Sequence, residues 1–399
     1  MGSINALDCL LAGYLMIGLT WLIKKRGLTK LNKFFKARLG IFIALLLLIL
    51  GLILAWLVNS DQKYFWDGLG TIKSFYILPI GYALITSYLI KIKIIKVTAL
   101  LNCLIILTVG LVGMGLFFLV LGQVTYDHRL SGFFASPNQL ALILMPGLLV
   151  LTHKLIIKNP NRSKLNQKNQ QLIKINLIII GLGFLIVLIA TRSSGAWAAL
   201  LVCGVYQLLY LSGLKLKLKH YKMINKLMLV VIIGFSILLL FSGPVQEIYN
   251  YSAFENKSSF DSRLVIYEVS GYLIANNWLF GIGANGFQAQ YLNAQNLYLP
   301  FPQWAVPNAH NNLLTVWLET GILGLFGFIY LIAKGLQSRI KNPGIEKIIL
   351  IYFLIHGLFE TSFWKNDLAI IFFLFLMITI INQKNQRPIV YEQSAVSNL

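Results

Sequence analysis

The sequence predicts an all-α polytopic membrane protein, with about 11–12 transmembrane helices and one long, partly helical extracytoplasmic loop. Three observations predict this fold. Of the 399 residues, 57% are apolar and only 12% are charged, a balance that soluble globular domains do not show. The apolar residues form runs of roughly 20, the length that crosses a bilayer as a helix. The basic residues gather in the loops on one side of these runs.

The apolar runs predict the order of the spans. They lie at 5–23, 39–58, 72–90, 97–121, 138–157, 175–191, 195–211, 227–242, 313–333, 346–363 and 367–382. Alternating sides place the N-terminus outside and the C-terminus inside, within a single integral membrane domain over residues 1–399. We expect Pro146 to bend the run that contains it. We expect no cleavable signal peptide, because basic residues follow the first run where a cleavage site would have small ones.

The basic residues set the orientation of the chain. All but seven of the 34 Lys and Arg residues fall in loops of the predicted cytoplasmic face. The exceptions are Lys63, Lys73, Arg129, Arg192, Lys257, Arg263 and Lys365. The net charge of +21 is therefore explained by loops facing an anionic leaflet, and we expect no binding of nucleic acid. The outer cations need another reason to be there.

The longest outer loop, residues 243–312, has the composition of a folded segment. It holds 13 aromatic residues against six charged ones, whereas disordered segments are poor in aromatics. Aromatic faces beside amide side chains suit a neutral, hydroxyl-rich ligand such as carbohydrate, although they could equally pack the loop. A helix should begin at Ser259 or Asp261 and run to about Asn276. Arg263 near its N-terminus could then hold a phosphate.

Three polar positions on or near the outer face are the first candidates for chemistry. Arg192 lies in a tight turn between two spans, among small residues that leave room for an anion. His310 ends the long loop where the next span begins, and histidine can take up a proton near neutral pH. Glu319 lies inside an apolar helix, where it could orient a basic partner or bind a neighbouring helix.

The remaining outer motifs are weaker. Arg129 is a second candidate for contact with an anion, whereas His128 is expected to be solvated. The GxGxxG pattern at 281–286 has no preceding strand and lies on the outer side, so we interpret it as a turn and not as a dinucleotide site. The outer loops offer no closely spaced pair of acidic residues, so we expect no metal ion and no cofactor.

The motifs together resemble the bacterial O-antigen ligase and O-antigen polymerase family. The segment 191–197, TRSSGAW, is similar to its T-x-S-R-G-A region, with the arginine one position earlier. The segments 262–268 and 278–283 look like its second arginine motif and glycine turn. The segment 310–321 is similar to its H-N-x-x-L…E-x-G signature. The resemblance covers about residues 125–375, and the motifs occur in the family's order.

The resemblance implies a metal-independent, inverting, GT-C-like glycosyltransferase of the bacterial inner membrane, with its active site on the extracytoplasmic face. Its partners would be an undecaprenyl-diphosphate-linked glycan donor, a glycan acceptor and the bilayer. Arg192 and Arg263 would neutralise the leaving diphosphate, and His310 would accept the proton of the acceptor hydroxyl. The expected substrate-binding residues are Arg129, Asn138, Tyr267, Asn311 and Glu319.

The sequence leaves two alternatives, and the first lies within the glycosyltransferase class. A polymerase adds repeat units to another lipid-linked unit, whereas a ligase uses a different acceptor. The sequence does not separate the two, and we favour a polymerase slightly. A polysaccharide or lipid transporter is the second alternative. Transporters typically have internal repeats and mid-membrane sites, whereas the candidate residues here gather at one face.

Overall fold

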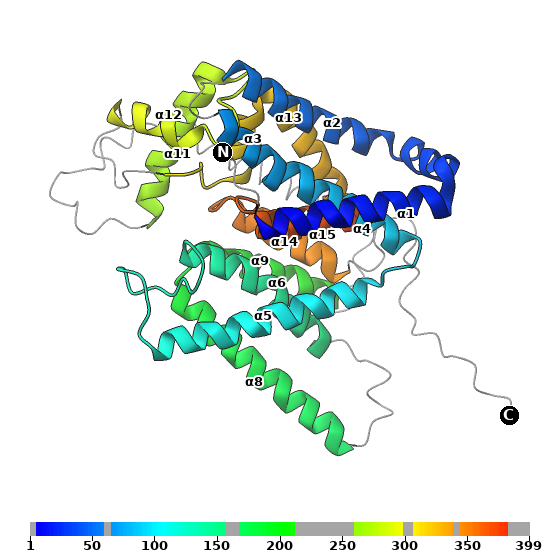
Figure 1. The fold of residues 1–399 in the computed structure, drawn as a ribbon. Coiled ribbons are helices and arrows are strands. Elements are labelled where there is room, and N and C mark those ends of the chain that lie inside the picture. The colour runs from blue at the N-terminus through cyan, green and yellow to red at the C-terminus, as the bar shows by residue number, and fades with distance from the viewer. Residues whose placement is uncertain are drawn as a thin grey trace. The chain divides into compact units, whose positions relative to one another are not determined.

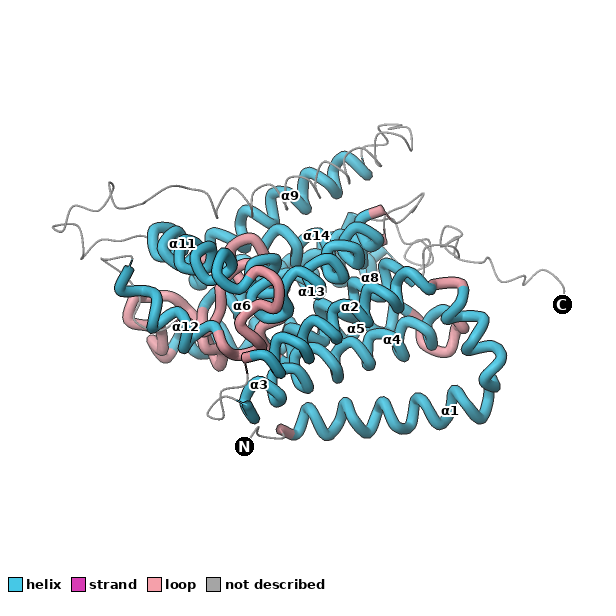
Figure 2. The backbone as a smooth tube through the Cα atoms, turned by 90° about the horizontal axis from the view of Figure 1, so that it is seen from above, coloured by secondary structure: helices cyan, strands magenta, loops and turns pink. Residues whose placement is uncertain are grey.

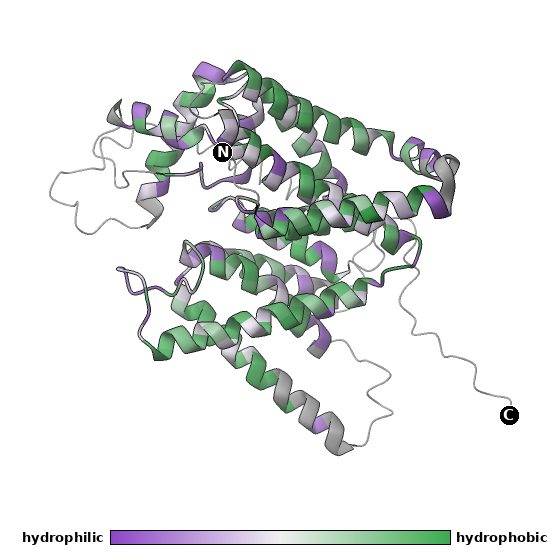
Figure 3. Cartoon of the chain, in the orientation of Figure 1, coloured by the Kyte–Doolittle hydropathy of each residue, from purple (hydrophilic) through white to green (hydrophobic). Residues whose placement is uncertain are grey.

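The structure is a computed structural model, and it describes residues 5–59, 65–156, 167–211, 259–297, 306–337 and 344–381. Every regular element in these ranges is a helix, and Figure 2 draws no strand among them. Five helices of the described part are long and apolar enough to cross a membrane. Apolar residues dominate such helices as α2 and α5 in Figure 3. The prediction of an all-α polytopic membrane protein is confirmed.

Contacts divide the chain into two compact units, which we describe separately. Unit 1 comprises Met1–Ser87, Leu216–Ser338 and Gly357–Ile380, and unit 2 comprises Tyr88–Lys215, Arg339–His356 and Ile381–Leu399. Figure 1 labels the helices of both. Unit 1 contains α1 (Ala6–Lys36), α2 (Leu39–Val58), α3 (Phe65–Thr71), the π-helix η1 (Ile72–Ile77), the first part of α4 (Leu78–Lys91), α11 (Ser259–Asn277), α12 (Phe287–Ala294), the 3-10 turn η4 (Gln295–Leu297), α13 (Asn312–Leu336) and α15 (Asn366–Ile381). Unit 2 contains α5 (Val97–Val120), α6 (Pro137–Ile156), α8 (Gln167–Thr191), α9 (Ser194–Leu211) and α14 (Ile345–His356).

Helices α2 and α13 form the closest helix pair of unit 1. Glycine is required where they meet, because a Cβ on Gly51 would lie 2.6 Å from the Thr320 carbonyl oxygen and 2.8 Å from the Gly324 nitrogen. Small residues of this kind let membrane helices approach closely and gain dispersion contacts, which lipid cannot replace. The pair is therefore a rigid support for whatever the N-terminal end of α13 carries.

A buried carboxylate ties the start of α1 to two other helices. Asp8 is 3% exposed and pairs with Lys73 Nζ at 2.8 Å. Ser74 Oγ and Asn366 Nδ2 donate to its two oxygens, each at 2.9 Å. The first turn of α1 therefore lies beside the start of α15. Lys73, one of the outer cations that orientation does not explain, is explained by this ion pair.

Two predicted spans differ from the observed helices. The run 313–333 is broken at Gly321, whose φ of 62° and ψ of −170° separate α13 into two helical segments. The run 346–363 becomes a helix of 12 residues that ends at His356, followed by turns to Lys365. Hydropathy did not detect either change, because both depend on backbone groups that find partners elsewhere in the fold. The run 227–242 lies outside the described residues, as do parts of the long loop.

Candidate active site

Helix α11, the glycine turn that follows it and the start of α13 pack together in unit 1. The helix is described from Ser259 to Asn277, which confirms the predicted segment and makes Arg263 its fifth residue. Gly281 and Gly283 have φ values of 71° and 82°, so the glycine pattern forms a turn, as predicted. Apolar side chains of α11, α12 and the start of α13 bury one another in a single cluster, among them Ile266, Phe287, Tyr291 and Leu314.

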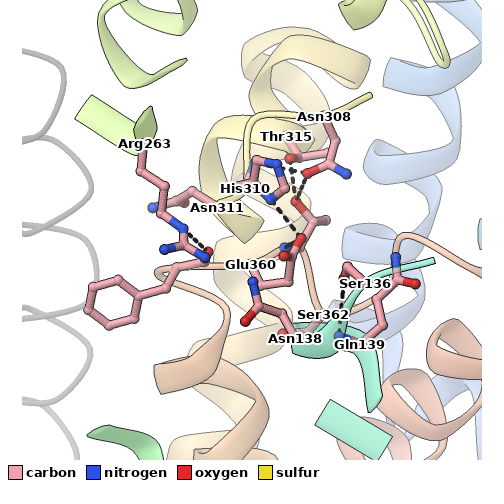
Figure 4. A network of polar contacts seen from close by, with 12 residues as sticks. Ser136, Asn138, Gln139, Arg263, Asn308, His310, Asn311, Thr315, Glu360 and Ser362 are labelled. Atoms are coloured by element: carbon pink, nitrogen blue, oxygen red, sulfur yellow. Dashed lines mark hydrogen bonds and ion pairs between the residues drawn. The ribbon is translucent and has the colours of Figure 1, made fainter. Parts of the chain in front are cut away.

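His310 forms the central pair of the site with Glu360. Its Nδ1 lies 2.8 Å from Glu360 Oε1, and the two side chains are 19% and 5% exposed. Figure 4 shows the pair with its neighbours. Nδ1 is engaged, and Nε2 has no hydrogen bond within the described part of the chain. A carboxylate on one ring nitrogen makes the other nitrogen the natural proton acceptor, because it fixes the tautomer and stabilises the imidazolium.

A set of buried hydrogen bonds holds this pair in place. Asn308 Oδ1 accepts from the backbone N–H of His310 and from Thr361 Oγ1, both at 2.8 Å. Thr361 Oγ1 also lies 2.9 Å from Thr315 Oγ1, and the Thr361 N–H donates to Glu360 Oε1 at 3.2 Å. His310 has a φ of 48°, a conformation that most residues avoid. The surrounding hydrogen bonds therefore hold the His310 backbone in a conformation that it would not adopt by itself, and this fixes where its imidazole points.

Tyr267 and Asn311, both predicted to bind substrate, support the His310 segment. The Tyr267 hydroxyl donates to the carbonyl oxygen of Leu358 at 2.9 Å and lies 3.3 Å from that of His310. Burial raises the pKa of Tyr267, so the hydroxyl remains a donor. Asn311 caps α13, accepting from Leu313 N at 2.9 Å. Both are buried, and contact with a substrate remains a prediction for each.

Arg263 lies beside the Glu360 segment. Its Nε donates to the Phe359 carbonyl oxygen at 2.8 Å, and the residue is 7% exposed. Figure 4 draws this bond as a dashed line from the Arg263 side chain. Unit 1 therefore brings together one predicted anion ligand, Arg263, and the predicted base, His310.

Arg192 lies in unit 2, in the turn between α8 and α9. It is exposed and has a φ of 48°. Arg129 ties this turn to the rest of the unit: its Nε donates to the Thr191 carbonyl oxygen at 2.8 Å, and its Nη2 to Asn138 Oδ1 at 2.9 Å. The Leu130 N–H also donates to the Ala190 carbonyl oxygen at 2.9 Å. The structure therefore brings Arg129 and Asn138 together with the Arg192 turn, while their contact with a substrate remains a prediction.

Glu319 is 1% exposed and accepts a hydrogen bond from the hydroxyl of Tyr76 in η1. Of the two roles left open by the sequence, the structure shows contact with a neighbouring helix. The Glu319 carboxylate is shielded from solvent, and its role as a substrate ligand stays a prediction. Within the described ranges, no cluster of three or more His, Cys, Asp or Glu side chains could hold a metal ion.

Sequence reasoning missed Glu360. It falls inside the apolar run 346–363, which we interpreted as a membrane span. A signal was present, because Glu360, Thr361 and Ser362 form a polar stretch after Gly357 within that run. Their side chains or N–H groups bond to residues 308–315 across the fold, for example Ser362 N to Asn312 Oδ1 at 2.7 Å. A charged residue within an apolar run is itself an indication of function.

Comparison with protein families gives one match. Residues 178–329 match a family model described as O-antigen ligase. The matched segment begins in α8 and ends in α13, so it includes Arg192, Arg263 and His310, whereas Glu360 lies beyond it. Comparisons with curated proteins and with solved structures gave no match. Over residues 178–329 the chain is therefore similar to the O-antigen ligase family, which supports a multi-pass membrane enzyme of O-antigen-type glycan assembly.

Proposed function

We propose that this protein is a glycosyltransferase of the bacterial inner membrane that polymerises or transfers undecaprenyl-diphosphate-linked oligosaccharide repeat units. The reaction would take place on the extracytoplasmic face, without a metal ion, and invert the anomeric centre. The observation that carries the proposal is the His310–Glu360 pair beside Arg263. His310 and Arg263 lie in the segment that matches the O-antigen ligase model, and Glu360 lies beyond its end.

His310 serves as the general base in this proposal. The acceptor sugar hydroxyl attacks the anomeric carbon of the donor, and its proton passes to His310 Nε2. The bond from the anomeric carbon to the diphosphate oxygen breaks, and its electron pair leaves with the diphosphate. Glu360, 2.8 Å from Nδ1, stabilises the imidazolium that forms. One displacement of this kind inverts the anomeric centre.

The arginines stabilise the charge that develops on the leaving group. The Arg263 guanidinium is oriented by the Phe359 carbonyl oxygen through Nε. Arg192 is exposed on a turn that precedes the N-terminus of α9, where unpaired N–H groups also favour an anion. Next to it, Ser193 Oγ is buried and has no hydrogen-bond partner within the described part. Arginine suits this role, since its planar group binds two phosphate oxygens at once.

The proposal is tested with purified protein in detergent and a defined lipid-linked oligosaccharide. Release of undecaprenyl diphosphate together with a longer glycan, in the presence of a chelator, is the expected result. Chain growth from donor alone identifies a polymerase, whereas product that requires a second acceptor class identifies a ligase. Donor that stays intact in detergent, with wild-type protein folded and binding it, would contradict glycosyl transfer. A transporter gives that outcome because it makes and breaks no bond.

A further inference from the structure

The break in α13 leaves backbone groups that a continuous helix would normally satisfy. At Gly321 the chain departs from helical geometry, so the groups on either side of the break lose their partners within the helix. Gly321 is buried, and an unpaired N–H or carbonyl in a buried position is costly because no water replaces the lost partner. The broken helix must therefore find its partners in another part of the protein.

The glycine turn after α11 supplies these partners. The Ile322 N–H donates to the carbonyl oxygens of Trp278 at 3.1 Å and Leu279 at 3.2 Å. In the other direction, the Ile282 N–H donates to the Leu318 carbonyl oxygen at 2.6 Å. A Cβ on Gly281 would overlap the Leu318 carbonyl oxygen, and one on Gly321 would overlap that of Leu279. We call these two segments, residues 278–286 and 318–322, the joint.

Two side chains connect the joint to η1. Glu319 points from the break to Tyr76 of η1, whose hydroxyl donates to it. The backbone N–H of Asn285 in the glycine turn also faces the Glu319 carboxylate. A π-helix widens the helical turn and often marks a functional position. Here η1 contributes Ser74 to the buried Asp8 and Tyr76 to the buried Glu319.

The joint lies at the far ends of the two helices that carry the candidate site. The first segment of α13 runs from the joint to Asn312, next to His310, and α11 runs from the joint back to Arg263. That segment has nine residues, Asn312–Thr320, and so spans about 14 Å. A tilt of about 5° at the joint would then move its far end by about 1 Å, and a misplacement of that size can cost about 100-fold in rate.

We propose that Glu319 and Tyr76 are positioning residues, which lock the joint and thereby hold His310 and Arg263 in the register that the reaction needs. The inference rests on the proposed function for its effect on turnover. Its structural part, the locking of the joint, stands by itself. In this role Glu319, which is buried and bonded to Tyr76, replaces the substrate contact expected from the sequence, so we expect the loss of either residue to lower the rate of transfer and to leave donor binding in place.

The test compares Tyr76→Phe, Glu319→Gln, Glu319→Ala and the double variant Tyr76→Phe/Glu319→Gln, each as purified full-length protein. Thr379→Val is the matched control, because Thr379 is also a buried hydroxyl of unit 1 and donates within its own helix, to the Phe375 carbonyl oxygen. Hydrogen exchange is measured on peptides that contain Ile282 and Ile322, together with kcat and the donor KM.

We expect Tyr76→Phe to speed exchange of the joint by about tenfold, since a buried carboxylate loses its donor, while Thr379→Val leaves exchange unchanged. We expect kcat to fall by about 10- to 100-fold with the donor KM within about twofold of wild type. Glu319→Gln should retain more turnover than Glu319→Ala, because its amide oxygen still accepts from Tyr76. The double variant should be no worse than Tyr76→Phe alone, since partners that act as one unit are not additive.

Unchanged exchange in Tyr76→Phe and Glu319→Ala would overturn the locking of the joint. Faster exchange with an unaltered kcat would overturn the positioning role. Multiplied effects in the double variant would overturn the pairing of the two residues. A wild-type protein that binds donor but performs no transfer would refute the proposed function instead, and the exchange measurement would still decide the joint.

Discussion

Replacing the carboxylate of Glu360 by an amide, Glu360→Gln, probes the base most sharply. The structure gives a distance of 2.8 Å between His310 Nδ1 and a carboxylate oxygen that is 5% exposed. In such a buried position, a hydrogen bond to a charged group contributes about 1.5–3 kcal/mol, which corresponds to about 10- to 150-fold in rate. The amide can also donate to Nδ1, which would leave the proton on Nε2 and block its role as acceptor. Loss of the correct tautomer costs up to about 10⁴-fold in a serine protease triad. We therefore expect kcat to fall by about 10² to 10⁴.

The assay is initial-rate turnover of a defined lipid-linked oligosaccharide, with donor binding measured separately. Glu346→Gln supplies the control, because it makes the same chemical change at another buried glutamate, in α14 and outside the proposed machinery. We expect donor binding within about twofold of wild type for Glu360→Gln, since the carboxylate faces the imidazole and not the donor. If kcat stayed within about threefold of the control, Glu360 would have no part in activating His310.

Three further predictions follow from the same contacts. Arg192→Ala or Arg263→Ala should abolish turnover while the protein still inserts in the membrane. Lysine at either position should restore turnover only in part, because its point charge lacks the guanidinium fork. Radiolabelled product formation measures both effects, and near-normal rates in both alanine variants would exclude the diphosphate role. Tyr267→Phe should lower the free energy of unfolding by about 1–2 kcal/mol, because the Leu358 carbonyl oxygen loses its buried donor. Since burial raises the pKa of Tyr267, that loss should be the same across the neutral pH range, and thermal unfolding at several pH values checks it. Asn311→Ala removes the N-cap of α13 and should lower the free energy of unfolding by about 1 kcal/mol in the same measurement. An unchanged free energy of unfolding would argue against a stabilising cap.

The sequence predicted those features that depend on hydropathy, charge and local propensity. The apolar runs and the one-sided cations predicted the all-helical membrane fold, and a capping residue at Ser259 or Asp261 predicted α11. The glycine pattern at 281–286 was interpreted as a turn because no strand precedes it, and the positive φ values of Gly281 and Gly283 agree with that interpretation. These signals are local, so a single sequence is enough to reveal them.

The features that sequence reasoning missed depend on partners distant in the chain. Gly321 can break α13 because the Ile322 N–H donates to the carbonyl oxygens of Trp278 and Leu279, which lie far earlier in the sequence. Glu360 becomes part of the site only because α14 ends at His356 and the chain turns back to His310. Hydropathy assigned both segments to uninterrupted spans, since it reports the mean character of a run and not the bonds of its backbone.

The measurement that tests the central claim most directly is a single turnover by His310→Gln, with enzyme in excess over a labelled lipid-linked donor. The glutamine side chain keeps polar contacts but has no group that takes up a proton near neutral pH. With His310 as the base, this variant binds the donor within about twofold of wild type and forms no glycan product on the time scale of many wild-type turnovers. Product formation at the wild-type rate would contradict proton transfer to His310 and, with it, the mechanism built on the His310–Glu360 pair.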